Sequence, residues 1–99
     1  MQQPLEKDFQ AAVVRLAKLC GWQVFHQYDS RKSEPGWPDL VLMRPPVILF
    51  RELKRALRPQ AVTIPQRKTL RMLAQCGCDT AIWTPADWKK IEETLQRRT

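Results

Sequence analysis

The sequence predicts one α/β (α+β) domain over residues 1–99, with the element order αβββαβα and a central mixed sheet flanked by helices. Three segments carry apolar side chains at helical spacing, and four short segments are rich in apolar, β-branched or aromatic residues. Glycine and proline separate these segments, and the first three strands follow one another closely, as in an antiparallel meander. A chain of 99 residues has the length of one domain with a modest core.

Residues 5–19 are expected to form the first helix, because their apolar side chains recur at helical spacing. Gly21 is the expected stop. Residues 22–28 contain aromatic and β-branched side chains and predict the first strand. The polar segment 29–37 predicts a loop.

The second and third strands are bounded by prolines. Pro38 can stand only at the start or edge of a strand, so the next strand is expected to begin near Asp39. Pro45 and Pro46 force a break after it. The third strand is then expected over residues 47–54.

Capping signals predict the second helix. Thr63 and Gln66 have the spacing of a capping box, and the helix that they open is expected to bury Leu70 and Leu73. Gly77 is the expected end of this helix.

The remaining elements are a strand over residues 79–83 and a last helix. Thr84 is the expected cap of that helix, with Pro85 at its first position and Asp87 three residues after the cap. The apolar stripe of the helix consists of Trp88, Ile91 and Leu95.

The charge balance favours an anionic partner. Lys and Arg number 17 against 10 Asp and Glu, which gives a net charge of +7. Such a field suits nucleic acid, although a merely basic surface is the alternative. The apolar runs are far too short to cross a bilayer and no signal-like segment opens the chain, so we expect no membrane partner and a cytoplasmic location. The three cysteines fit neither a zinc pattern nor a disulfide framework.

A pair of short motifs carries the predicted chemistry. Asp39 opens the apolar run 40–43, and Glu52 and Lys54 follow the run 47–50. Positions two apart on a strand point to the same face, so the Glu52 carboxylate and the Lys54 ammonium should lie side by side. If the two runs are neighbouring strands, Asp39 joins them. Two carboxylates suit Mg²⁺, and a lysine beside them suits an attacking water or a phosphate; a turn and a surface ion pair are the alternative.

Two polar residues lie on apolar helical stripes. Glu6 shares a stripe with Phe9 and Val13, and Gln66 shares one with Leu70. Each stands in the first turn of its helix, from which it could face the same cluster as Asp39. The alternatives are that Glu6 only favours the positive end of the helix and that Gln66 only completes its cap.

Aromatic side chains form a further group. His26 is expected to be a satisfied core residue rather than a base or ligand. Four tryptophans exceed the usual need of so small a core. Some are therefore candidates for a dimer interface or for stacking on unpaired bases.

With these residues in place, the chain resembles the PD-(D/E)XK nuclease superfamily, and in particular the stand-alone virus-type replication-repair nuclease (VRR-NUC) family. The resemblance covers nearly the whole chain. It rests on Glu6, the segment Ser33-x-x-Gly36-Trp37-Pro38-Asp39-Leu40, Glu52-Leu53-Lys54, Gln66 and the Gly77 turn. Its loosest point is Trp37, where related sequences often carry another aromatic or apolar residue.

The resemblance implies a restriction-endonuclease-like core and a metal-dependent endodeoxyribonuclease. Asp39, Glu52 and the carbonyl of Leu53 would hold Mg²⁺, for which Mn²⁺ would substitute, and Glu6 would hold a second metal or orient a water. Lys54 would position or deprotonate the attacking water, and Gln66 would position the water or the scissile phosphate. No organic cofactor is expected.

The resemblance also implies partners. Stand-alone members of the family are similar to junction resolvases, so a homodimer that cuts branched DNA such as four-way junctions is expected, in a bacterial or phage-infected cell. Two-fold symmetry would supply two sites for two strands. Basic and polar residues around the motifs are the expected phosphate contacts: Arg31, Lys32, Ser33, Arg51, Arg55 and Arg58.

Two functions of other classes remain open from the sequence alone. One is a DNA-binding module that holds DNA without cutting it, and the other is a structural subunit of a repair or packaging assembly. The presence of Asp39, Glu52 and Lys54 together favours the nuclease, since a retired site has no need of all three.

Overall fold

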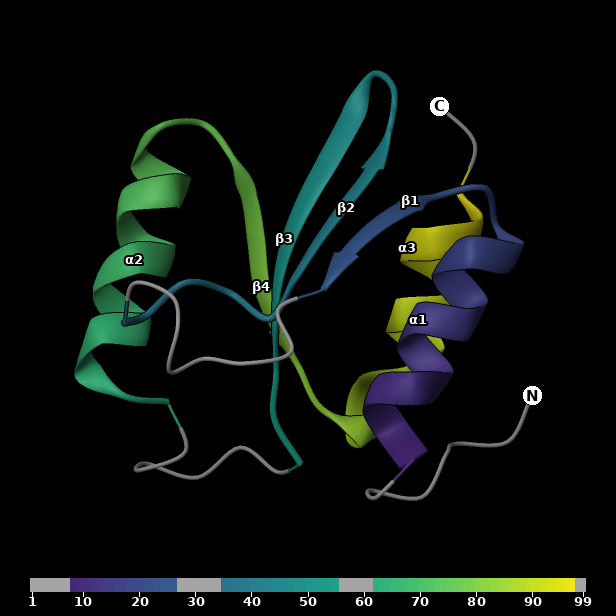
Figure 1. Cartoon of the computed structure of the whole chain (residues 1–99), viewed down its shortest axis with the longest axis horizontal. Helices are drawn as coiled ribbons and strands as arrows, with labels where there is room; N and C mark the ends of the chain where they lie inside the picture. The colour runs from purple at the N-terminus through teal and green to yellow at the C-terminus, as the bar shows by residue number, and fades with distance from the viewer. Residues whose placement is uncertain (1–7, 27–34, 56–61, 98–99) are drawn as a thin grey trace.

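A computed structural model describes residues 8–26, 35–55 and 62–97 of the chain (Figure 1). Within these residues the fold is of the α+β class, with a four-stranded mixed sheet between helices, as predicted. The elements are α1 (Phe9–Leu19), β1 (Gln23–His26), β2 (Leu40–Arg44), β3 (Val47–Leu53), α2 (Ile64–Gln75), β4 (Asp79–Trp83), the 3₁₀ turn η3 (Pro85–Asp87) and α3 (Trp88–Gln96).

The sheet has the strand order β1-β2-β3-β4. The first three strands form the predicted antiparallel meander, and β4 pairs with β3 in parallel. A parallel pair needs a crossover connection, and α2 supplies it. The β2–β3 turn is formed by Pro45 and Pro46, which are joined by a cis peptide bond.

The helices cover both faces of the sheet: α2 lies on one side, and α1 and α3 lie together on the other (Figure 1). The main core is between the sheet and the α1–α3 pair. It is built from side chains of α1, the sheet and α3, with the predicted stripe of α3 fully included: Phe9, Val13, Leu16, Ala17, Trp22, Leu40, Leu42, Leu49, Trp83, Trp88, Ile91 and Leu95. On the α2 side, Leu70 is buried, whereas Leu73 is only half-buried.

The predicted capping signals form as expected. The Thr63 side chain accepts from the backbone N–H of Gln66, whose own side chain accepts from the Thr63 N–H. Thr84 and Asp87 make the equivalent box at the 3₁₀ turn η3, with Pro85 in its first position. The predicted cap therefore lies one turn before the α-helix itself, since α3 begins at Trp88. These reciprocal contacts satisfy N–H groups that a helix start otherwise leaves unpaired.

Element ends differ slightly from the predictions. The third strand ends at Leu53, one residue before Lys54, and the second begins at Leu40, just after Asp39. The predicted start of the first helix and end of the first strand lie outside the described residues. No helix in the described parts of the chain is long and apolar enough to cross a membrane.

Candidate functional site

The β2–β3 register brings the two predicted acidic residues together. Leu40 pairs with Arg51, so the next position outward places Asp39 opposite Glu52. The backbone N–H of Asp39 donates to Oε1 of Glu52 over 3.3 Å. The twelve residues between the acids are accounted for by five paired residues on each strand and the two-residue turn. The predicted convergence of Asp39 and Glu52 is therefore confirmed.

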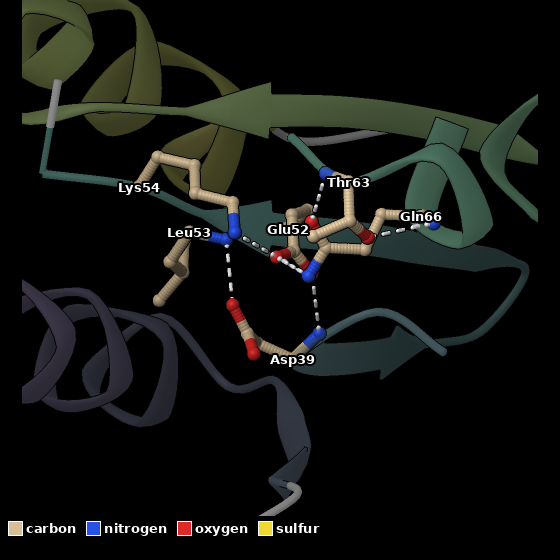
Figure 2. A network of polar contacts seen from close by, with 6 residues as sticks. All are labelled: Asp39, Glu52, Leu53, Lys54, Thr63 and Gln66. Carbon is tan, nitrogen blue, oxygen red and sulfur yellow. Dashed lines mark hydrogen bonds and ion pairs between the residues drawn. The ribbon is translucent and has the colours of Figure 1, made fainter. Parts of the chain in front are cut away.

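Asp39 is fixed by the neighbouring strand. Its Oδ2 atom accepts from the backbone N–H of Leu53 over 2.9 Å (Figure 2). The carboxylate thus lies at the end of β3, beside the residue whose carbonyl the family resemblance assigns to a metal. Within the described residues, Oδ1 of Asp39 makes no hydrogen bond, and it remains available as an acceptor.

Glu52 is the buried centre of the site. It is 1% exposed, and three groups surround its carboxylate. Oε2 accepts from Lys54 Nζ at 3.0 Å and from Gln66 Nε2 at 2.8 Å, while Oε1 accepts from the Asp39 N–H. A buried carboxylate is costly without such partners, and here they come from the residue after β3, from α2 and from the residue before β2 (Figure 2).

Lys54 lies where the two-residue strand period predicts. Its ammonium pairs with Glu52 two positions earlier, and its side chain is 19% exposed. Its backbone N–H donates to the carbonyl of Trp83 over 3.0 Å, which extends the β3–β4 pairing by one residue. The ammonium is therefore held against the buried carboxylate while part of the side chain reaches solvent.

Gln66 fills both of the roles that the sequence left open. Its Oε1 atom accepts from the Thr63 N–H at 2.9 Å and completes the cap of α2. Its Nε2 atom donates to Glu52. The first turn of α2 is thereby tied directly to the acidic site (Figure 2).

The electrostatics of the pair favour a bound cation. Burial raises the pKa of Glu52, and the nearby Asp39 carboxylate raises this pKa further. The hydrogen bond and charge of Lys54 oppose the shift but do not cancel it. The carboxylates therefore repel one another across the strand pair, and a positive charge between them would relieve that repulsion.

The donor set fits a hard divalent cation. Asp39 and Glu52 offer carboxylate oxygens. Oδ1 of Asp39 is free of hydrogen bonds among the described residues, and Oε1 of Glu52 accepts only one, whereas Oε2 of Glu52 already accepts two. In residues 8–26, 35–55 and 62–97 no group of three or more His, Cys, Asp or Glu side chains is placed to hold a metal. The two acids alone would thus leave several coordination positions to water or phosphate, which is the usual arrangement for Mg²⁺.

Arg51 requires a correction. Its side chain is 4% exposed, and its guanidinium donates to the backbone carbonyls of Phe50 and Asp79 and to the Asp79 carboxylate at 2.9 Å. It also lies over the ring of Trp83, 4.7 Å from the ring centre. Burial lowers the pKa of Arg51, and Asp79 opposes that shift. The predicted phosphate contact does not hold, because this arginine belongs to the β3–β4 packing.

The other predicted site residues fall into two groups. Arg55 is exposed just after β3 and close in sequence to Lys54. The rest lie outside the described residues: Glu6, Arg31, Lys32, Ser33 and Arg58.

Sequence reasoning missed a contact on the neighbouring strand. The side chain of Gln10 in α1 contacts His26 Nε2, and His26 pairs with Leu40 in the strand register. Burial lowers the pKa of His26, and the charge of Asp39 opposes this shift, so the imidazole lies within electrostatic reach of the site. No sequence pattern indicated it, because Gln10 and His26 belong to different elements that only tertiary packing brings together.

Comparison of the chain with protein-family models, with curated proteins and with solved structures found no match. The interpretation of the site therefore rests on its own geometry and on the motif residues.

Proposed function

We propose that the protein is a Mg²⁺-dependent endodeoxyribonuclease with a restriction-endonuclease-like fold, of the VRR-NUC type, that hydrolyses phosphodiester bonds in branched DNA as a homodimer. The observation that carries the proposal is the cluster of Asp39, Glu52 and Lys54 at one end of a strand pair, with Lys54 Nζ 3.0 Å from Glu52 Oε2. The alternative is an ion pair on the protein surface, but in such a pair Glu52 would not be buried to 1% exposure.

Asp39 and Glu52 would hold the metal, with the Leu53 carbonyl as a further candidate ligand beside them. Bound there, the cation would supply Lewis-acid polarisation of a phosphate oxygen and a more acidic water. Glu6 is proposed as an additional acid of the site.

Lys54 would act directly on the reacting groups. Its ammonium is the cationic donor next to the two acids, so it is suited to orient an attacking water or to stabilise the negative charge that grows on the phosphate oxygens. Glu52 restrains the ammonium on one side, which reduces the reorganisation needed when substrate arrives.

Gln66 would position Glu52 and offer its amide to a water or phosphate. The same amide also caps α2, so Gln66 links the first turn of that helix to the carboxylate. The chain's net charge of +7 supports a polyanionic substrate. Arg55 is a proposed contact for the phosphates of the DNA backbone. The other proposed contacts lie outside the described residues: Arg31, Lys32, Ser33 and Arg58.

The test is a cleavage panel with linear duplex, single strand, flap, fork and four-way junction, each with Mg²⁺, with Mn²⁺ and with chelator. We expect metal-dependent cutting that is strongest on a branched substrate. Binding without cutting in either metal would instead favour the non-catalytic DNA-binding module. Sedimentation of the purified protein tests the expected dimer.

A further inference from the structure

We propose that Trp37 is a stacking platform for an unpaired base adjacent to the phosphate held at the Asp39–Glu52–Lys54 site. This inference rests on the proposed function and narrows its substrate to DNA that offers an unstacked base at that position.

Trp37 differs from the other tryptophans of the chain. Trp37 is 43% exposed, whereas Trp22, Trp83 and Trp88 are 3–5% exposed and belong to the core. Core packing therefore explains three of the four tryptophans and leaves Trp37 without such a role. An indole in water exposes a large apolar face, and such faces are used to stack on bases irrespective of sequence.

The contact with Phe50 leaves at least one face of the indole uncovered by that ring. Trp37 contacts Phe50 in a T-shaped arrangement, with ring centres 6.0 Å apart and planes at 88°. In this geometry Phe50 covers at most one face of the indole. Phe50 itself is only 9% exposed, so the contact anchors Trp37 to the sheet.

The segment that carries Trp37 is held closely against α2 (Figure 1). Gly36 has φ +94°, and a Cβ atom there would lie 2.4 Å from the carbonyl oxygen of Pro65 and 2.8 Å from Thr69 Oγ1. Pro38, the next residue after Trp37, is buried and limits the backbone on the other side. The backbone that carries the indole is thus constrained before a ligand arrives, which lowers the entropic cost of stacking.

Position then indicates the ligand. Trp37 precedes Asp39 by two residues, so their Cα atoms are at most ~7.6 Å apart. A nucleotide whose phosphate is held by Lys54 and by a cation on Asp39 and Glu52 would carry its own or its neighbour's base toward Trp37. In a continuous duplex that base is paired and stacked, whereas at a branch, flap or single strand it is free to leave the stack.

The test is a binding titration with Ca²⁺ in place of Mg²⁺, which keeps a hard cation at the two carboxylates, with wild-type protein, Trp37→Ala and Trp37→Phe. A denaturing gel of the same samples checks that the DNA stays uncut. The probes are a duplex with one unpaired adenine, the same duplex with an abasic residue at that position, and the fully paired duplex. We expect Trp37→Ala to weaken binding of the unpaired-adenine DNA by about 5- to 150-fold and to change the other two by less than about twofold. Trp37→Phe keeps an aromatic face and should retain most of the affinity.

Fluorescence gives a second readout in the wild-type protein. Since the other three tryptophans are buried, base stacking should quench the exposed component of the emission and protect it from acrylamide, and only with the unpaired-adenine DNA.

Leu19→Ala is the matched control, because Leu19 is 77% exposed at the end of α1, on the opposite side of the sheet from α2. It should bind all three probes like wild type.

Three results with Trp37→Ala would overturn the inference. They are an equal loss of affinity for all three probes, wild-type affinity for all three, and a shift of this variant from dimer to monomer. If Trp37→Ala fails to fold, the wild-type fluorescence still decides, since emission unchanged by unpaired DNA contradicts stacking. These readouts do not require cleavage. A protein that stacks but never cuts would refute the nuclease proposal alone, and one that cuts without base-dependent binding would refute the stacking alone.

Discussion

Asp39 lies opposite Glu52 across the β2–β3 pair, and its backbone N–H donates to Glu52 Oε1 over 3.3 Å. The relationship is fixed by the register, because a slip of one residue would send one of the two side chains to the other face of the sheet. Two acids far apart in the sequence are thereby held together by backbone pairing.

Removing the charge of Glu52 should change how stability depends on pH. The pKa of Glu52 is raised by burial and by Asp39, so the folded protein binds this proton more tightly than the unfolded chain does. Its contribution to stability is complete below the unfolded pKa of about 4.3 and is lost as pH rises through the folded pKa. In chelator, the unfolding free energy of wild type should therefore fall relative to Glu52→Gln across that window. Urea titrations at several pH values measure the difference, and parallel pH profiles would contradict it.

Binding of a metal ion should offset the stability that the protein loses at neutral pH when the buried Glu52 is charged. A cation that binds only the folded protein adds about 1.4 kcal/mol at ten times its Kd, which corresponds to a rise of roughly 5–10 °C in Tm for a domain of this size. Wild type should show this rise with Mg²⁺, and Asp39→Asn and Glu52→Gln should not. An equal rise in all three proteins would place the metal elsewhere.

Two substitutions separate the cap from the site at Gln66. Gln66→Ala removes both the capping contact and the donor to Glu52, and should cost on the order of 1 kcal/mol of stability together with most of the activity. Gln66→Glu keeps an acceptor for the Thr63 N–H but sets a second carboxylate against Glu52. Gln66→Glu should lose activity through this repulsion. If it cleaves DNA at the wild-type rate, the role of Gln66 is limited to capping α2. Thermal melting and cleavage rates measure the two effects.

Arg51 and Arg55 should respond in opposite ways. Arg51→Ala removes a buried group with three acceptors and should destabilise the fold by about 2–4 kcal/mol, while the salt dependence of DNA binding stays unchanged. Arg55→Ala should leave Tm within about 2 °C of wild type and reduce the slope of log affinity against log salt by about 0.9. Melting curves and salt titrations on one duplex distinguish them, and a reduced slope for Arg51→Ala would restore it as a phosphate contact.

Gly36 should be intolerant of any side chain. A Cβ atom at this position would approach the backbone of Pro65 to 2.4 Å, and the positive φ of +94° strains any residue other than glycine. Gly36→Ala should therefore push the segment carrying Asp39 away from α2. We expect Tm to fall by more than about 5 °C and the rate of DNA cleavage to fall as well. Gly77→Ala is the matched control, since Gly77 also has a positive φ of +87°, but a Cβ atom there would meet nothing within 4 Å among the described residues. Equal losses in both variants would reduce the effect to backbone strain.

Local rules predicted the site geometry well where one physical cause dominated. The strand period placed Lys54 beside Glu52, and the ion pair confirms it. The capping box at Thr63 followed from residue spacing alone. The predicted catalytic and metal-binding roles of these residues stay predictions.

The sequence could not predict which basic residues are exposed. Arg51 follows the alternation of β3 onto the face that carries Trp83, and its pairing with Asp79 depends on the parallel register of β3 and β4. That register is set by the crossover from β3 through α2 to β4 rather than by any local pattern. The exposure of Trp37 among four tryptophans likewise depends on tertiary packing that no periodicity encodes.

The most direct test of the account is cleavage of a four-way junction in Mg²⁺ by wild type and by Lys54→Ala, with circular dichroism and DNA affinity measured on the same samples. We predict metal-dependent cutting by wild type and a loss of at least about 100-fold in Lys54→Ala, with fold and affinity retained. Wild-type cutting by Lys54→Ala, or no cutting by either protein in Mg²⁺ or Mn²⁺, would contradict the claim that Asp39, Glu52 and Lys54 form a nuclease site.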